Sequence, residues 1–387
     1  MTKWPEGNAI IYCQGAFNTP NGKTAHGLVR FTKRYRILAV IDSNYTGQDA
    51  GEVLDGKHKK IPIFSSVEEA SRFLNDHGES ATHLVIGLAP DGGRLNHSAK
   101  QDVKRAIQLG LHVDSGLHDF LTEDSDMVQL AEEHHVVLRD VRKPPPRKQL
   151  HFFNGKIEEV KCLKIAVLGT DSAVGKRTTA WLLVQAFEDR GYKAEMVGTG
   201  QTAWLQGARY SLMLDSLIND FVTGEIEHAV WSAWKEMQPD VIVIEGQGSL
   251  MNPAYPGGFE ILAAARPHGV VLQHAPARIE YDGFPGYPIQ PLDHQIQAIE
   301  VVLGRKVMAI TINHENISPD QIENSLKNIS KNTSLPAFDV LQTTAQGLAD
   351  VFMPYIHQSV HISPYKKLKH IFHRKGKRIY DETRSHG

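Results

Sequence analysis

The stretch 163–179, LKIAVLGTDSAVGKRTT, combines the residue types that bind phosphate groups. Gly169 and Gly175 would let backbone N–H groups curl around an anion, and Lys176 could reach the outer phosphates. An apolar run precedes the loop as a strand, and apolar residues recur beyond it at helical spacing. We therefore predict a phosphate-binding loop, strand–loop–helix in type, with contacts from Gly169, Thr170, Asp171, Ser172, Ala173, Val174, Gly175, Lys176, Arg177, Thr178 and Thr179.

The loop departs from the common phosphate-binding pattern at two points. Five residues, instead of four, separate Gly169 from Gly175, and Arg177 stands where a serine or threonine ordinarily holds Mg²⁺. A guanidinium cannot ligate a metal ion, because it has donors only. Two alternatives remain open: Thr178 takes the metal in a shifted register, or the loop binds phosphates through charge and backbone N–H groups alone.

Two further strand exits carry glycines that would let a ligand approach the backbone. One follows the predicted strand 193–197, and the other follows the apolar run 241–244. Glu245 closes that second run in the manner of a Walker B acid, whose carboxylate binds Mg²⁺. We predict cofactor contacts from Gly198, Thr199, Gly200 and Gln201, substrate contacts from Gly246, Gln247 and Gly248, and, if Mg-ATP is used, metal contacts from Thr178, Asp215 and Glu245.

Candidate catalytic and substrate-binding groups also lie at predicted strand exits. His274 and His118 each follow a strand, so either imidazole, or the carboxylate of Glu245, could act as a general base. Arg278 and Arg94 offer planar guanidinium groups whose shape matches a carboxylate, so we predict that they bind an acidic substrate.

The elements that position these residues predict an α/β fold with two parallel-sheet domains. Residues 1–143 alternate short apolar runs with helical patterns, which predicts a Rossmann-like domain of about five strands. The GxGxxG turn of dinucleotide sites is missing there, so we expect no nicotinamide cofactor and expect Asp42 to cap a loop. The segment 22–24, GKT, imitates a phosphate loop, but Pro20 interrupts it and we expect a turn.

The remainder of the chain divides into three segments. We predict a Pro-rich basic linker at 144–160, a P-loop NTPase-like domain at 161–360 with a helical pattern over 211–234, and a basic tail at 361–387. The tail carries seven Lys or Arg and no acid between Tyr365 and Arg378. We expect this run to be a solvated terminus, although its charge could also contact RNA or membrane phosphates.

Composition limits the classes of function. The net charge of −2 over 387 residues requires neither nucleic acid nor a membrane surface as partner. Cys13 and Cys162 stand alone in the sequence, so neither a disulfide framework nor a zinc site is predicted. No signal-peptide pattern or membrane-length apolar run is seen, and we expect a cytoplasmic protein with a small-molecule substrate.

Several motifs together resemble a family long described only as a domain of unknown function, some of whose members are described as D-glutamate N-acetyltransferases. The resemblance rests on GTDSAVGKRTT, VGTGQT, DSLINDFVTGE and IEGQGSL in the second half, and on KTAHGL, APDGGRL, SGLHDFL and HAPAR elsewhere. It implies a Rossmann-like N-terminal domain, a P-loop C-terminal domain and a homo-oligomer. The phosphate loop and EGQGS also resemble dethiobiotin synthetase, an ATP- and Mg²⁺-dependent enzyme.

Three functions follow from these observations. The resemblance implies transfer of an acetyl group from acetyl-CoA to D-glutamate, with the CoA phosphates in a metal-free loop. The second alternative is an ATP- and Mg²⁺-dependent ligase or kinase that acts on a carboxylate. The third is a nucleotide-binding sensor in which the P-loop domain sets the angle of the N-terminal domain.

Overall fold

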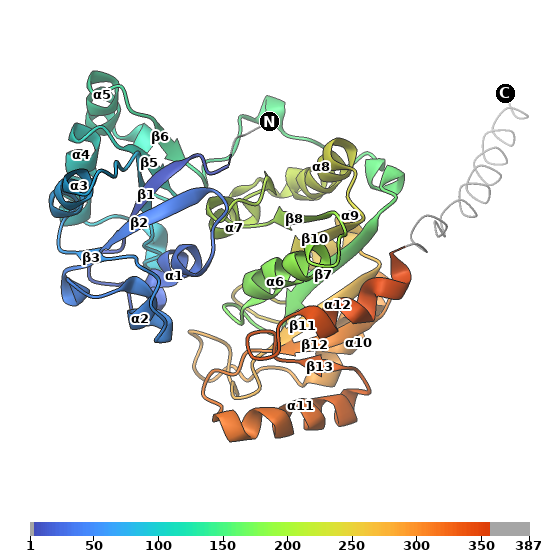
Figure 1. Cartoon of the computed structure of the whole chain (residues 1–387). Coiled ribbons are helices and arrows are strands. Elements are labelled where there is room, and N and C mark those ends of the chain that lie inside the picture. The colour runs from blue at the N-terminus through green and yellow to red at the C-terminus, as the bar shows by residue number, and fades with distance from the viewer. Residues whose placement is uncertain (1–3, 357–387) are drawn as a thin grey trace, which may run out of the picture.

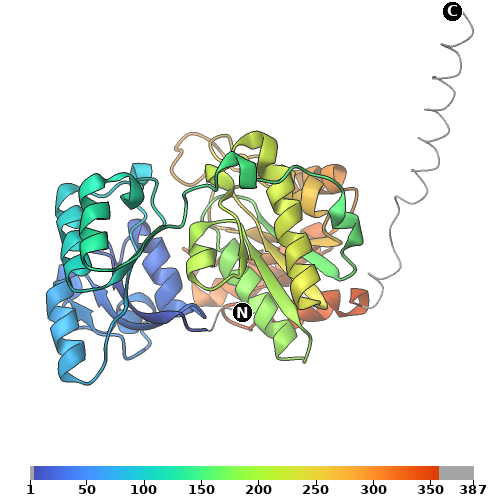
Figure 2. The same cartoon turned by 90° about the horizontal axis from the view of Figure 1, so that it is seen from above.

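The computed structural model describes residues 4–356, which form two α/β domains side by side (Figures 1 and 2). Each domain has one sheet, and the pairings between its strands are parallel. The predicted fold class, two parallel-sheet α/β domains, is confirmed.

The N-terminal sheet has the order β3-β2-β1-β4-β5-β6. Its strands are β1 (Gly7–Tyr12), β2 (Tyr35–Ile41), β3 (Ile63–Phe64), β4 (His83–Ile86), β5 (His112–Ser115) and β6 (Leu138–Asp140). The helices between them are α1 (Lys23–Arg30), α2 (Ala50–Asp55), α3 (Val67–Asp76), α4 (His97–Gln108) and α5 (Ser125–Glu133). Asp42 caps the turn after β2, as predicted, because its carboxylate accepts hydrogen bonds from the Asn44 and Phe17 amides.

The C-terminal sheet has the order β13-β12-β11-β7-β10-β8-β9. Its strands are β7 (Leu163–Gly169), β8 (Ala194–Gly198), β9 (Tyr210–Ser211), β10 (Val241–Glu245), β11 (Gly269–His274), β12 (Val307–Ile312) and β13 (Ala337–Phe338). Its helices are α6 (Lys176–Glu188), α7 (Gln201–Leu205), α8 (Asn219–Met237), α9 (Phe259–Ala265), α10 (Leu292–Leu303), α11 (Pro319–Thr333) and α12 (Gln346–Phe352).

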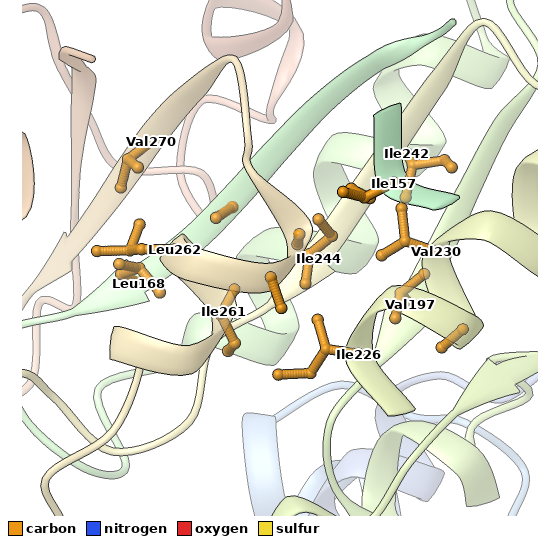
Figure 3. Close-up of a cluster of buried hydrophobic side chains, with 14 of the residues drawn as sticks. Ile157, Leu168, Val197, Ile226, Val230, Ile242, Ile244, Ile261, Leu262 and Val270 are labelled. Carbon is orange, nitrogen blue, oxygen red and sulfur yellow. The ribbon is translucent and has the colours of Figure 1, made fainter. Parts of the chain in front are cut away.

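Strand β7 lies at the centre of this sheet and is buried at every position. Helices cover both faces of a parallel sheet, so its inner strands are continuous apolar runs. Val167 faces one core cluster, and Leu168 faces the other, which also includes Ile244 and Val230 (Figure 3). This packing places the phosphate loop, which follows β7, in the middle of the carboxyl edge of the sheet.

The helix predicted over 211–234 is wrong in its first third. Tyr210 and Ser211 form strand β9 beside β8, and α8 begins only at Asn219. In the irregular segment between them Leu212 and Leu214 are buried and Leu217 is half-buried, and the Leu212 amide donates to the Gly198 carbonyl at 3.0 Å. Their spacing imitates a helix because each one reaches the same core.

The segment predicted to be a linker packs along α8. Ile157 is fully buried in the C-terminal core, and the carboxylate of Glu227 accepts hydrogen bonds from the Asn154 and Ile157 amides at 2.8 and 3.1 Å. The buried acid therefore anchors the second half of this stretch to the P-loop domain.

Helix α7 of the C-terminal domain packs against the N-terminal domain. Leu205 is buried in an N-terminal core cluster, and the guanidinium of Arg34 stacks 3.6 Å from the Trp204 ring while its Nε donates to the Trp204 carbonyl at 2.7 Å. Because α7 directly follows β8, the N-terminal domain is held next to one of the predicted ligand-binding strand exits.

None of the helices within residues 4–356 has the length and apolar character needed to cross a bilayer. The predicted tail at 361–387 lies outside the described residues. The cytoplasmic location, the homo-oligomer and the absence of a nucleic-acid partner stay predictions.

Candidate functional site

The phosphate loop joins β7 to α6 through two residues with positive φ. Ala173 has φ 51° and Gly175 has φ 102°, and Gly175 is the N-cap of α6. A Cβ at Gly169 would lie 3.0 Å from the Nζ of Lys176, so glycine lets the lysine fold back over the end of the strand. The loop thus combines the N-terminus of a 13-residue helix with a lysine above it, the arrangement that binds phosphate.

The ammonium of Lys176 is held by backbone carbonyls. Its Nζ donates to the Asp171 and Gly248 carbonyl oxygens at 2.7 and 2.9 Å, so it links the phosphate loop to the exit of β10. Burial lowers the pKa of Lys176 to about 8, although the carboxylates of Glu245 and Asp171 act in the opposite direction.

We expect the affinity of this loop for a phosphate-bearing ligand to fall as the pH rises above about 8, the pKa of Lys176. A phosphate binds the ammonium form of Lys176, which is already present below this pKa. Above this pKa the lysine must take up a proton when the phosphate binds, and the affinity falls. Titration calorimetry of CoA between about pH 6.5 and 9.5 should show Kd rising by up to about tenfold per pH unit. In Lys176→Arg, which stays charged, this slope should vanish, and its persistence would assign it to another group.

Arg177 carries a guanidinium that donates no hydrogen bond within residues 4–356. Its Nε is shielded from solvent and has no partner. Burial lowers the pKa of Arg177, and the nearby carboxylate of Glu245 opposes that change. A buried donor without an acceptor is destabilising by about 1–3 kcal/mol, and by more when it is charged. The guanidinium therefore has a buried donor that lacks an acceptor, although the carboxylate of Glu245 is near.

Glu245 ends β10 next to both cations. Its side chain is only 7% exposed, and the carboxylate accepts a hydrogen bond from the Thr199 amide at 3.0 Å. Burial raises the pKa of Glu245, against the opposing effects of Arg177 and Lys176. The acid therefore holds a proton at a higher pH than an exposed glutamate does.

The predicted glycine-rich exits of β8 and β10 lie together. The Thr199 hydroxyl donates to the Glu245 carbonyl at 3.2 Å and to the Gln247 side chain at 3.3 Å. A Cβ at Gly246 would lie 2.4 Å from the Val167 carbonyl oxygen, so the backbone passes too close for any side chain. The structure thus brings Gly198, Thr199, Gly200, Gly246, Gln247 and Gly248 to one edge, beside Lys176.

Asp171 organises the loop, a role that its place in the sequence did not indicate. This fully buried carboxylate accepts hydrogen bonds from Asn252 Nδ2, from Arg278 Nη1 and from the Asp282 amide, each at 2.9 Å. Asn252 was missed in the sequence analysis, and its only signal is an Asn-Pro turn after the glycines of the β10 exit.

Arg278 is not a free carboxylate clamp. Its guanidinium pairs with Asp171 and with Glu315, and Nη1 also donates to the Ser172 carbonyl at 2.8 Å. A substrate carboxylate would have to displace one of these partners. Arg94, the other predicted clamp, is exposed and has no ion pair within residues 4–356.

The two candidate histidines lie in different domains. His274 ends β11 and contacts the Thr170 hydroxyl at 3.0 Å, and burial lowers its pKa to about 4, so it is neutral at pH 7 and a weak base. His118 follows β5 in the N-terminal domain, where its amide donates to the Gly93 carbonyl at 2.9 Å and burial lowers its pKa.

The predicted magnesium ligands do not form a set. Asp215 forms an ion pair with Arg142 between the two domains, and the Thr178 hydroxyl makes no hydrogen bond within residues 4–356. In the described part of the chain, no cluster of three or more His, Cys, Asp or Glu is arranged to hold a metal. Thr179 also differs from the prediction, because its hydroxyl donates to the Gln273 side chain at 2.5 Å inside the domain. The three predicted ligands are therefore not brought together around one metal position.

A cavity of about 600 Å³ lies far from this edge, at the amino end of β2. It is lined by residues of α1, β2 and α3, among them Arg30, Tyr35 and Phe73. Parallel sheets bind ligands at their carboxyl ends, so this cavity does not compete with the phosphate loop as the candidate site.

Comparison with known proteins places both halves of the chain in one family. Residues 151–349 match the family described as "Domain of unknown function (DUF1611_C) P-loop domain", and residues 43–144 match "Domain of unknown function (DUF1611_N) Rossmann-like domain". A crystal structure of a DUF1611 family protein from Anabaena variabilis is 30% identical, with a TM-score of 0.82, and the match covers 90% of this chain and 99% of that one.

Two curated relatives bear the name D-glutamate N-acetyltransferase. The protein from Tritonibacter scottomollicae is 30% identical over 70% of this chain and 80% of its own length. The protein from a Pseudoalteromonas species is 29% identical over 68% of this chain and 78% of its own length. The predicted family resemblance is confirmed.

Proposed function

Because this chain belongs to the DUF1611 family, we propose that it is an N-acetyltransferase that moves the acetyl group of acetyl-CoA to the amine of D-glutamate. The names of the two curated relatives support the transferase class. For this chain, the observation that carries the proposal is Arg177, whose buried Nε has no acceptor within residues 4–356, at the position where an ATP-dependent enzyme holds Mg²⁺ through a hydroxyl.

The cations at the start of α6 suit the phosphates of CoA. CoA carries a pyrophosphate and a 3′-phosphate, and the loop offers Lys176, Arg177 and the N-terminal amides of α6. These groups bind phosphate by charge and hydrogen bonding, which requires no metal ion. An acetyl transfer leaves the phosphates intact, so it needs no other function from this loop.

Among the candidate general bases, Glu245 is the one whose pKa is raised by burial. D-Glutamate reaches the site as an ammonium, which must lose a proton before its nitrogen can attack a thioester. Burial raises the pKa of Glu245, whereas it lowers the pKa of His274 to about 4 and makes that imidazole a poor proton acceptor. His118, from the N-terminal domain, is the remaining candidate.

The proposed reaction balances without a further reactant. Glu245 takes one proton from the ammonium, the nitrogen bonds to the thioester carbonyl carbon, and the carbon–sulfur bond breaks. The second amine proton leaves with the CoA thiol, and Glu245 returns its proton to solvent. Backbone amides at the exits of β8 and β10 would stabilise the oxyanion, and Arg94 would bind a substrate carboxylate.

Release of free CoA thiol from acetyl-CoA tests this proposal. With ATP absent and EDTA present, we expect thiol release that depends on D-glutamate, with a slower rate for L-glutamate and none without amine. Glu245→Gln should retain CoA binding and lose about a hundredfold or more in kcat, because the amide cannot accept the proton.

Failure with every amine would overturn the transferase proposal. A second candidate, an Mg-ATP-dependent ligase or kinase, is favoured by one observation, the buried acid at the end of β10. Phosphate release from Mg-ATP with a panel of carboxylic acids would then identify it. A nucleotide-dependent change in domain angle without turnover would favour the sensor.

A further inference from the structure

Gly27 lies where the N-terminal domain meets the phosphate loop helix. It sits in the middle of α1, where glycine is less favourable than alanine by about 1 kcal/mol. A Cβ at this position would lie 3.1 Å from Arg177 Nη2, 3.1 Å from Thr202 Cγ2 and 3.3 Å from Gln206 Nε2. Glycine is therefore explained by close approach: the Arg177 guanidinium packs directly on the backbone of α1.

Helix α1 is held rigidly at this position by α7. The Gln206 Nε2 donates to the Gly27 and Phe31 carbonyls at 2.8 and 3.0 Å, and the Thr24 and Thr202 hydroxyls share a hydrogen bond of 3.1 Å. These contacts join the domains at both ends of α1, which faces α6 and α7 in Figure 1. The surface against Arg177 is thus fixed in place.

This surface limits where the Arg177 guanidinium can lie. The backbone of α1 blocks it on one side, its Nε is shielded from solvent, and it donates no hydrogen bond within residues 4–356. A cation confined in this way, without an acceptor, is preorganised for an anionic ligand, because it loses little side-chain freedom on binding.

We propose that the N-terminal domain is part of the phosphate site and that Gly27 is a positioning residue, which holds the Arg177 guanidinium toward the ligand. The inference rests on the proposed function only in taking CoA as the natural ligand, since any phosphate at the loop would meet the same cation. The P-loop domain alone would have the lysine in place but would lack this constraint on the arginine.

A double-mutant cycle between positions 27 and 177 tests the inference. Kd values for CoA and for inorganic pyrophosphate are measured by calorimetry in EDTA for the full chain, Gly27→Ala, Arg177→Lys and the double variant. We expect Gly27→Ala to weaken binding about tenfold, because the added methyl displaces the guanidinium. In the Arg177→Lys background, Gly27→Ala should weaken binding less than about twofold, because lysine has no atom equivalent to the guanidinium Nη2 that contacts α1.

The control is Lys33→Ala, which removes an exposed ion pair between the domains, with Glu188 at 3.2 Å, and should leave both Kd values unchanged. Equal losses from Gly27→Ala in both backgrounds would show that the glycine only supports the interface, and would overturn the inference. If the effects of the two substitutions on pyrophosphate affinity are coupled but no thiol is released from acetyl-CoA, the inference stands and the transferase proposal is refuted.

Discussion

Lys176→Ala should lower the affinity for CoA by about a hundredfold to a thousandfold and reduce kcat/KM by a similar factor. The Lys176 side chain is largely buried and its ammonium is already aligned by the Asp171 and Gly248 carbonyls, so it would make a charge-assisted contact with a phosphate. Such contacts are about twice as strong as neutral hydrogen bonds, and their removal makes the free energy of binding less favourable by several kcal/mol. Calorimetry of CoA and steady-state thiol release measure the two effects.

Lys164→Met is the matched control for this prediction. Lys164 is a second buried lysine on β7, 5% exposed, but it lies at the amino end of the strand, away from the loop. Its replacement should leave CoA affinity unchanged. A Lys176→Ala protein that folds with an unchanged melting temperature and binds CoA normally would refute the phosphate loop itself.

Arg177→Thr should lower CoA affinity by about tenfold to a hundredfold and leave the residual binding indifferent to Mg²⁺. The substitution removes a guanidinium whose buried Nε lacks an acceptor. Asp215 is paired with Arg142, so Glu245 and Asp215 are not both available to hold a metal beside the new hydroxyl. Binding should be compared in EDTA and in Mg²⁺, because a metal-held phosphate would respond to the ion whereas a guanidinium-held phosphate would not.

Arg190→Thr gives the corresponding control, since Arg190 follows the other end of α6 and pairs with Asp350 at 2.6 Å. It should not affect CoA binding. If Arg177→Thr instead gains Mg²⁺-dependent ATP hydrolysis, then Glu245 and Thr178 already form a latent metal site, and the metal-free account of this loop is wrong.

The predicted parts of the site share one property: their signals are local. The glycines, Lys176 and Arg177 lie within nine residues, and Glu245 closes its own apolar strand. A strand followed by glycines and a helix has few conformations, so the sequence determined the phosphate loop, the two parallel sheets and the carboxyl edge on which ligands bind. The family motifs pointed to the same residues.

The tertiary structure alone decided how these residues are partnered. It pairs Arg278 with Asp171, 107 positions apart, and Arg142 with Asp215, 73 positions apart. The predicted carboxylate clamp, Arg278, and the predicted metal ligand, Asp215, are therefore already paired within the protein. The tertiary structure also places Gly27 against Arg177, although the GKT segment, which leads into the same helix, suggested only an imitation of a phosphate loop. Pairings between distant residues leave no periodicity or spacing in the sequence, because they depend on which surfaces the folded domains bring together.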